Sequence, residues 1–209
     1  MTMNSDKKVC IIDYGSGNAR SVYNIFQSIH PFVKLSCMPD DIEDATHLVL
    51  PGVGAFGATM EKLKTLSILG ILEKNVLKDK KHFLGICVGM QILAGEGMEH
   101  GVYKGLGWIP GTVKIIDTRG LCLPHVGWNN FKMRRDNALL EGINQGTDFY
   151  YVHSYQFEAS DTKDVVATCE YGVEFAAIIN VENIYGVQFH PEKSQKAGKR
   201  LLQNFMRLT

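Results

Sequence analysis

The sequence predicts an α/β fold with a mostly parallel central sheet, helices on both faces in a three-layer arrangement, and added antiparallel strands in the C-terminal half. Two observations predict it. In the first half, short β-rich apolar runs alternate with segments of helical periodicity, which is typical of a parallel sheet covered by helices. In the second half, short alternating segments are separated by Gly, Asn and Asp turns, which indicates antiparallel strands.

The first-half elements follow from apolar spacing and from the residues that interrupt it. A strand at 8–13 is followed by Gly15 and Gly17, and then by apolar side chains at helical spacing up to Pro31, which ends that helix. The predicted strands of this half are 8–13, 32–35, 47–50 and 83–86, and the predicted helices are 18–29, one or two within 56–78, and 88–94.

The second-half elements are shorter, and turn residues bound them. The predicted strands are 113–116, 129–133, 149–152, 165–169, 175–179 and 185–189, and a helix at 193–207 closes the chain. Because we find no internal repeat, low-complexity run or linker, we expect residues 1–209 to form a single domain.

Composition narrows the class of partner. Lys and Arg number 22 and so do Asp and Glu, so no net charge attracts nucleic acid or an anionic membrane, and we expect small molecules or proteins instead. The polar start Met1 to Lys8 lacks the apolar region of a signal peptide, and no stretch reaches transmembrane length. The five cysteines lack C-x-x-C spacing, which argues against a disulfide framework or a zinc cluster. We therefore expect a cytoplasmic protein without metal or cofactor.

The segment 84–91, Leu-Gly-Ile-Cys-Val-Gly-Met-Gln, carries the clearest chemical signal. Glycines two residues before and after Cys87 permit the sharp strand-to-helix turn of a nucleophile elbow, which exposes the thiol at a helix N-terminus that favours thiolate. The backbone N–H of Val88 would then face an oxyanion formed by attack of Cys87 on a carbonyl. The alternative interpretation is a buried structural cysteine, as we expect for Cys10, Cys37 and Cys169.

A candidate base lies in the segment 188–194, Gln-Phe-His-Pro-Glu-Lys-Ser. Residues two apart in extended chain share a face, so Glu192 is expected near the imidazole of His190, where it would hold the tautomer and stabilise imidazolium. A surface His-x-Glu pair is the alternative, and metal ligation is disfavoured because no third ligand has suitable spacing. The combination with the elbow favours a Cys87, His190, Glu192 triad.

The segment 50–57, Leu-Pro-Gly-Val-Gly-Ala-Phe-Gly, permits two interpretations. It matches the G-x-G-x-x-G pattern of dinucleotide sites, but it does not follow the first strand and lacks the acidic residue expected about 20 positions later. The second interpretation is a loop at Gly52 and Val53 that brings another backbone N–H beside the nucleophile, and this suits Cys87.

At these three motifs the sequence resembles the class I, triad-type glutamine amidotransferases, and within them the glutaminase subunits that serve histidine biosynthesis. The resemblance extends along nearly the whole chain, through 12–18, 50–57, 84–91, 124–129, 151–155 and 188–194. It implies that Cys87 forms a γ-glutamyl thioester with glutamine and that His190 protonates the departing ammonia and then activates water. It also implies a separate (β/α)8-barrel cyclase that receives the ammonia and makes imidazole glycerol phosphate.

The resemblance implies roles for further residues, which divide into a substrate pocket and a partner surface. Gln91 would bind glutamine and Glu99 would contact its α-amino group, although the run 95–99 around Glu99 departs from the family pattern, and Ser16 replaces a residue that is often Met or Pro. The implied pocket residues are Gln91, Glu99, His153, Ser154 and Tyr155, and the implied cyclase-facing residues are Asn18, Trp128 and Asn129.

Three alternatives stay open at the sequence level. Paralogues with the same chemistry serve a different synthase, for example in amidino-sugar biosynthesis. A stand-alone thiol hydrolase would use the same elbow without a partner. A non-catalytic binding module is disfavoured because Cys87, His190 and Glu192 are all present.

Overall fold

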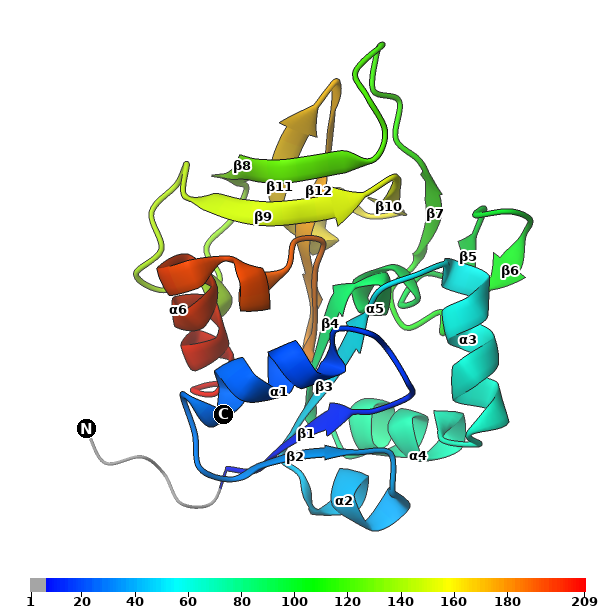
Figure 1. The fold of residues 1–209 in the computed structure, drawn as a ribbon, viewed down its shortest axis with the longest axis vertical. Coiled ribbons are helices and arrows are strands. Elements are labelled where there is room, and N and C mark those ends of the chain that lie inside the picture. Colours follow the sequence, from blue (N-terminus) through cyan, green and yellow to red (C-terminus); the bar gives the residue numbers. More distant parts are fainter. Residues whose placement is uncertain (1–6) are drawn as a thin grey trace.

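The computed structural model describes residues 7–209, and its central feature is a nine-stranded sheet of order β2-β1-β3-β4-β13-β12-β11-β8-β9 (Figure 1). The predicted fold class is confirmed: the sheet is parallel in one half, antiparallel in the other, and covered by helices. Most of the polar start, residues 1–6, lies outside the described part of the chain.

The parallel half of the sheet carries the ends of strands at which the candidate site forms. Four of its five strands are largely buried apolar runs, as expected for strands covered on both faces, and the edge strand at 33–36 is only partly buried. They are β1 (Val9–Ile12), β2 (Val33–Ser36), β3 (His47–Gly52), β4 (His82–Cys87) and β13 (Ile184–Val187). Because β13 runs parallel to β4, the chain leaving β13 comes close to the chain leaving β4.

The antiparallel half extends the sheet beyond β13. Its strands alternate buried and exposed side chains where one face is open, most clearly in β8. They are β12 (Val173–Val181), β11 (Val165–Tyr171), β8 (His125–Met133) and β9 (Asp148–His153).

A second, four-stranded sheet corrects one expectation. The predicted strand at 113–116 does not extend the central sheet. It pairs instead with the strand at 155–159, and both belong to the second sheet. The sheet consists of β10 (Tyr155–Ala159), β7 (Gly111–Ile115), β5 (Glu96–Gly97) and β6 (Tyr103–Lys104). Only Ser154 separates β9 from β10, so the chain changes sheets beside the candidate site.

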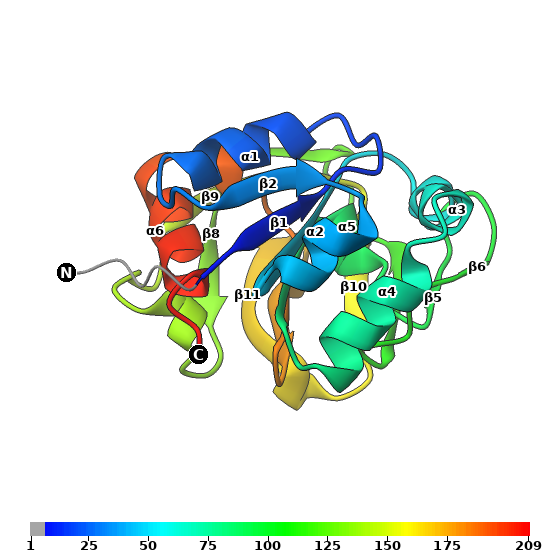
Figure 2. The same cartoon turned by 90° about the horizontal axis from the view of Figure 1, so that it is seen from below.

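Helices cover both faces of the central sheet (Figure 2). On one face lie α1 (Ala19–Gln27) and α6 (Gln195–Phe205), and on the other α2 (Pro39–Asp44) and α4 (Leu69–Glu73). The remaining helical elements are α3 (Phe56–Thr65), the π-turn η1 (Lys74–Lys78), α5 (Val88–Gln91), and the 3₁₀ turns η2 (Ala138–Leu140), η3 (Thr162–Asp164) and η4 (Pro191–Lys193).

Three predicted helices are shorter than the sequence indicated, and the first of them, expected at 18–29, spans Ala19–Gln27. The helix expected at 88–94 ends at Gln91, because Leu93 and Ala94 bond to carbonyls three residues back, in tighter turns. The helix expected at 193–207 begins at Gln195, after the separate turn η4. Over residues 7–209 no helix is long and apolar enough to cross a membrane, and no group of three or more His, Cys, Asp or Glu side chains is arranged to hold a metal ion.

Candidate active site

Cys87 stands at the turn between β4 and α5, in the conformation of a nucleophile elbow. Its φ of 55° and ψ of −110° lie outside the regions that non-glycine residues ordinarily occupy, so the turn is strained at this residue. The flanking glycines are sterically required: a Cβ on Gly85 would lie 2.3 Å from the Gly89 carbonyl oxygen, and one on Gly89 would lie 2.0 Å from the Leu50 carbonyl oxygen. These close approaches explain the glycine spacing seen in the sequence.

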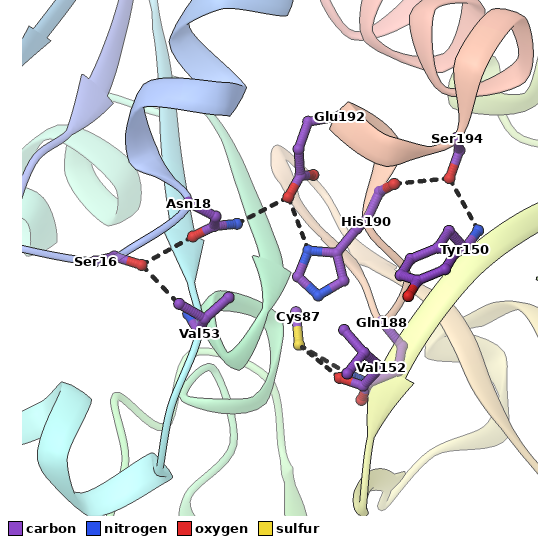
Figure 3. A network of polar contacts seen from close by, with 10 residues as sticks. All are labelled: Ser16, Asn18, Val53, Cys87, Tyr150, Val152, Gln188, His190, Glu192 and Ser194. Atoms are coloured by element: carbon purple, nitrogen blue, oxygen red, sulfur yellow. Dashed lines mark hydrogen bonds and ion pairs between the residues drawn. The ribbon is translucent and has the colours of Figure 1, made fainter. Parts of the chain in front are cut away.

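His190 and Glu192 form a fully buried pair beside the cysteine (Figure 3). His190 Nδ1 lies 2.8 Å from Glu192 Oε1, and neither side chain is exposed. The contact is the expected one, but its geometry is not that of extended chain, because Pro191 starts a 3₁₀ turn that carries Glu192 back toward the imidazole. The other imidazole nitrogen, Nε2, is buried without a hydrogen-bond partner among the described residues, and the ring lies between Glu192 and Cys87.

The electrostatics of the pair favour an imidazolium and a carboxylate. Burial lowers the pKa of His190, but its contacts with Cys87 and Glu192 outweigh burial and raise the pKa to about 10. Burial likewise raises the pKa of Glu192, whereas its contacts with His190 and Asn18 outweigh that effect and hold it below the usual value. His190 can therefore hold a proton next to the thiol and give it up to a leaving group.

Asn18 completes the environment of the carboxylate. Its side chain is 5% exposed, and its Nδ2 donates to Glu192 Oε1 at 3.0 Å. The same oxygen of Glu192 thus accepts from both Asn18 and His190. The structure gives Asn18 a position inside the site, and the partner contact expected of it stays a prediction.

A hydroxyl connects this carboxylate to the loop that follows β3 (Figure 3). Ser16 Oγ donates to Asn18 Oδ1 at 2.8 Å and accepts from the Val53 backbone N–H at 3.2 Å. The Val53 N–H, expected as a second oxyanion donor, is therefore engaged by Ser16. A continuous series of hydrogen bonds joins Val53, Ser16, Asn18, Glu192 and His190.

A cavity of about 190 Å³ opens beside the sulfur of Cys87. It collects most of the predicted oxyanion and substrate residues from four separate segments, but Gly52 is not among its lining residues. The predicted residues that line it are Val53, Val88, Gln91, Glu99, His153, Ser154 and Tyr155. Val152 also lines it, and its carbonyl oxygen lies 3.9 Å from Cys87 Sγ.

Gln91 is oriented toward the cavity by two buried acceptors. The residue is 3% exposed, so Gln91 belongs to the buried lining of the site and not to the solvated surface of the helix. Its Nε2 donates to the Tyr155 carbonyl and to Gln188 Oε1, both at 3.0 Å, which leaves Oε1 to accept from a ligand. Gln188 in turn places its own Nε2 3.7 Å from Cys87 Sγ.

Glu99 lines the cavity while one of its oxygens is already engaged. Its Oε2 accepts from the Phe56 backbone N–H at 2.7 Å, at the start of α3. A carboxylate with a second oxygen facing the cavity can accept from an ammonium group, which suits the α-amino contact predicted for it.

The predicted partner residues on β8 are only partly exposed. Trp128 is 49% exposed and packs edge-on against Tyr150, whereas Asn129 is half-buried and its Nδ2 donates to the Glu170 carbonyl at 2.9 Å. Their contact with a partner stays a prediction.

Sequence reasoning did not assign roles to three polar side chains that the site uses. These are Ser16, Gln188 and Ser194, whose hydroxyl donates to the His190 carbonyl and accepts from the Tyr150 N–H. Gln188 carried a usable signal, because a polar residue interrupts the apolar run 184–189 directly before the candidate base. The role of Ser16 depends on its contact with Val53, 37 positions away, and no local pattern indicates that contact.

Comparisons with known proteins agree with this geometry. The family model described as glutamine amidotransferase class-I matches residues 10–208. The chain is 43% identical to imidazole glycerol phosphate synthase subunit HisH of Bdellovibrio bacteriovorus, over 93% of this chain and 97% of that one. It is 42% identical to subunit HisH 1 of Campylobacter jejuni, over 96% and 100% of the two chains. Among solved structures, one titled as a glutamine amidotransferase superposes with a TM-score of 0.75 at 17% identity, covering 95% of this chain and 97% of that one, which indicates a shared fold.

Proposed function

Since the chain belongs to the class-I glutamine amidotransferase family, we propose that it is the glutaminase subunit of an imidazole glycerol phosphate synthase in histidine biosynthesis. In this role it hydrolyses glutamine to glutamate and ammonia and delivers the ammonia to a (β/α)8-barrel cyclase. All five cysteines are free, which suits a reducing compartment such as the cytoplasm.

In the first half of the reaction, Cys87 Sγ attacks the side-chain amide carbon of glutamine. The carbonyl oxygen becomes an oxyanion, and we assign the Val88 N–H at the start of α5 as a donor to it. His190 holds the thiol proton and passes it from Nε2 to the amide nitrogen, so that the C–N bond breaks, ammonia leaves and a γ-glutamyl thioester remains. Glu192 keeps Nδ1 of His190 protonated and stabilises the imidazolium.

In the second half, water replaces ammonia. His190 takes a proton from the water, which attacks the thioester carbon, and the C–S bond breaks to release glutamate and restore the thiol. Gln91 Oε1 and the free oxygen of Glu99 accept hydrogen bonds from the α-ammonium group of the substrate during both halves.

The bond between Val53 and Ser16 supports a low activity for the chain without its partner. With the Val53 N–H turned to Ser16 Oγ, only one of the two expected oxyanion donors faces the reacting carbonyl. Loss of one such donor costs on the order of 10²–10³ in rate in other acyl-transfer enzymes. Binding of the cyclase and its ligand would restore activity by releasing this N–H.

The observation that carries the proposal is the buried series Asn18, Glu192, His190 beside Cys87 and the cavity. The test is glutamate release from glutamine by the purified chain, alone and with the cyclase and its ribonucleotide ligand. We expect weak activity alone and strong stimulation by both together. Rapid hydrolysis by the lone chain, unchanged by the cyclase, would favour a stand-alone thiol hydrolase.

A second candidate keeps the chemistry and changes the synthase that receives ammonia. The Campylobacter jejuni relative is numbered HisH 1, as expected where an organism has more than one such subunit, so a paralogous partner such as an amidino-sugar synthase is a specific alternative. The same assay separates the two, because stimulation would then require the other synthase.

A further inference from the structure

A pair of buried histidines lies next to the cavity, outside the Cys87, His190, Glu192 group. His125 on β8 and His153 on β9 are directly opposite each other in the antiparallel pairing, so their side chains share one face. His125 Nδ1 lies 3.0 Å from His153 Nε2, and the two residues are 3% and 6% exposed. His153 lines the cavity, while His125 lies behind it.

The hydrogen-bond partners of the pair determine its protonation. His153 Nδ1 lies 2.9 Å from the Tyr155 carbonyl oxygen, which can only accept, so this nitrogen carries a hydrogen. In neutral His153, Nε2 is then an acceptor, and His125 Nδ1 must donate to it. His125 Nε2 is left as an acceptor 3.3 Å from Asn129 Nδ2, which has hydrogens to donate. Every nitrogen is satisfied when both rings are neutral and carry their hydrogen on Nδ1.

The surroundings of the pair reinforce the neutral state. The His125 ring is stacked between Tyr171, at a centroid distance of 4.1 Å, and Tyr151, at 5.0 Å. Burial lowers the pKa of His125 to about 4 and that of His153 to about 3, and for His153 the nearby His125 and His190 act in the same direction. The titratable groups next to the two histidines are the phenols of Tyr151 and Tyr171 and the imidazole of His190.

The Tyr155 carbonyl connects the pair to the substrate pocket. It accepts from His153 Nδ1 at 2.9 Å and from Gln91 Nε2 at 3.0 Å, so both of its lone pairs are used. Gln91 also donates to Gln188, whose amide reaches the sulfur of Cys87. The orientation of Gln91 Oε1 in the cavity therefore depends on a carbonyl that His153 holds, and His125 fixes the tautomer of His153.

We propose that His125 and His153 are positioning residues for glutamine hydrolysis: as a neutral pair in one tautomeric state they hold the Tyr155 carbonyl, and through it Gln91, in the geometry that binds substrate. The proposal rests on the proposed glutaminase function. Neither imidazole exchanges a proton with the substrate. The pair acts through Gln91 on glutamine binding, so its loss should change KM more than kcat.

The test compares His125→Phe with His125→Asn in the complex of the full chain, the cyclase and its ligand. Phenylalanine keeps the stack on Tyr171 but removes both nitrogens, whereas asparagine keeps an N–H donor near the position of Nδ1. In His125→Phe the buried acceptor His153 Nε2 is left without its donor, which corresponds to roughly a 5- to 160-fold rise in KM. We expect kcat within about threefold of wild type and substantial recovery of KM in His125→Asn. The matched control is His82→Phe, because His82 is a partly buried histidine at the end of β4 opposite to Cys87. We expect its KM to be unchanged.

A second measurement does not depend on activity. Proton–nitrogen correlation spectra of the full chain should show His125 and His153 as neutral Nδ1–H tautomers at pH 6. Either ring found as the Nε2–H tautomer or as a cation at that pH would overturn the proposal, as would a wild-type KM in His125→Phe. A wild-type complex that does not hydrolyse glutamine would instead overturn the proposed function, and the positioning role with it.

Discussion

Replacing Ser16 by alanine is expected to raise the glutaminase activity of the chain in the absence of its partner. The Ser16 hydroxyl accepts from the Val53 N–H at 3.2 Å, and this bond keeps a potential oxyanion donor away from the site. A neutral hydrogen bond contributes about 0.5–1.5 kcal/mol net, so its loss should increase the population with a free Val53 N–H by roughly 2- to 12-fold. The distance is at the long end for an N–H donor, which favours the lower part of that range.

The assay is initial-rate glutamate release by the lone chain at saturating glutamine, with Asn18→Ala as the matched control. Asn18 bonds to the same Ser16 hydroxyl but also donates to Glu192, a hydrogen bond to a charged group. Its loss should therefore lower the rate, by roughly 12- to 160-fold if the full 1.5–3 kcal/mol typical of such bonds acts on the reaction. A lower rate in Ser16→Ala, or a higher one in Asn18→Ala, would show that the Ser16 hydroxyl does not limit the rate by holding the Val53 N–H.

Three further outcomes are expected. His190→Ala should nearly abolish glutamine turnover by the complex. Glu192→Ala should retain measurable activity, because the imidazole of His190 is still present but poorly oriented. A wild-type rate in either variant would remove the substituted residue from the mechanism. Gly89→Ala should prevent formation of the elbow, since a Cβ there would lie 2.0 Å from the Leu50 carbonyl oxygen, and urea unfolding should show a loss of about 3 kcal/mol or more or no folded protein. Burial lowers the pKa of His47 to about 3, below its value in the unfolded chain, so the unfolded chain binds a proton first as pH falls. The free energy of unfolding should therefore decline by up to about 1.4 kcal/mol per pH unit below about pH 6.5, and the part of this decline due to His47 should be absent in His47→Phe. Urea unfolding at pH 7 and pH 5 would measure it.

The elbow and the base were predictable because their information is local. Glycines on either side of Cys87 are needed for a turn that spans only a few residues, and Glu192 follows His190 at a spacing that a short turn brings together. The parallel strands inside the sheet were predictable for a related reason, since each is a short, largely apolar run buried on both faces.

The connections between these segments were not predictable from spacing. The bond between Asn18 and Glu192 joins residues 174 positions apart, and it exists because β1 and β13 run parallel in one sheet and end at the same edge of it. The second sheet likewise depends on the change of direction at Ser154, which alternation of apolar and polar residues does not reveal. The pairing of His125 with His153 depends on the register of β8 and β9, which the sequence leaves open.

Covalent labelling of the cysteines tests whether His190 and Glu192 make Cys87 the nucleophile toward glutamine. The complex would be treated with an electrophilic glutamine analogue, and the labelled residue identified by mass spectrometry of its peptides. We expect labelling of the buried Cys87 in preference to the exposed Cys122, and loss of that labelling in His190→Ala. Labelling at Cys122 with Cys87 unmodified would show that Cys87 is not the nucleophile. Labelling of Cys87 that persists unchanged in His190→Ala would show that His190 does not activate it.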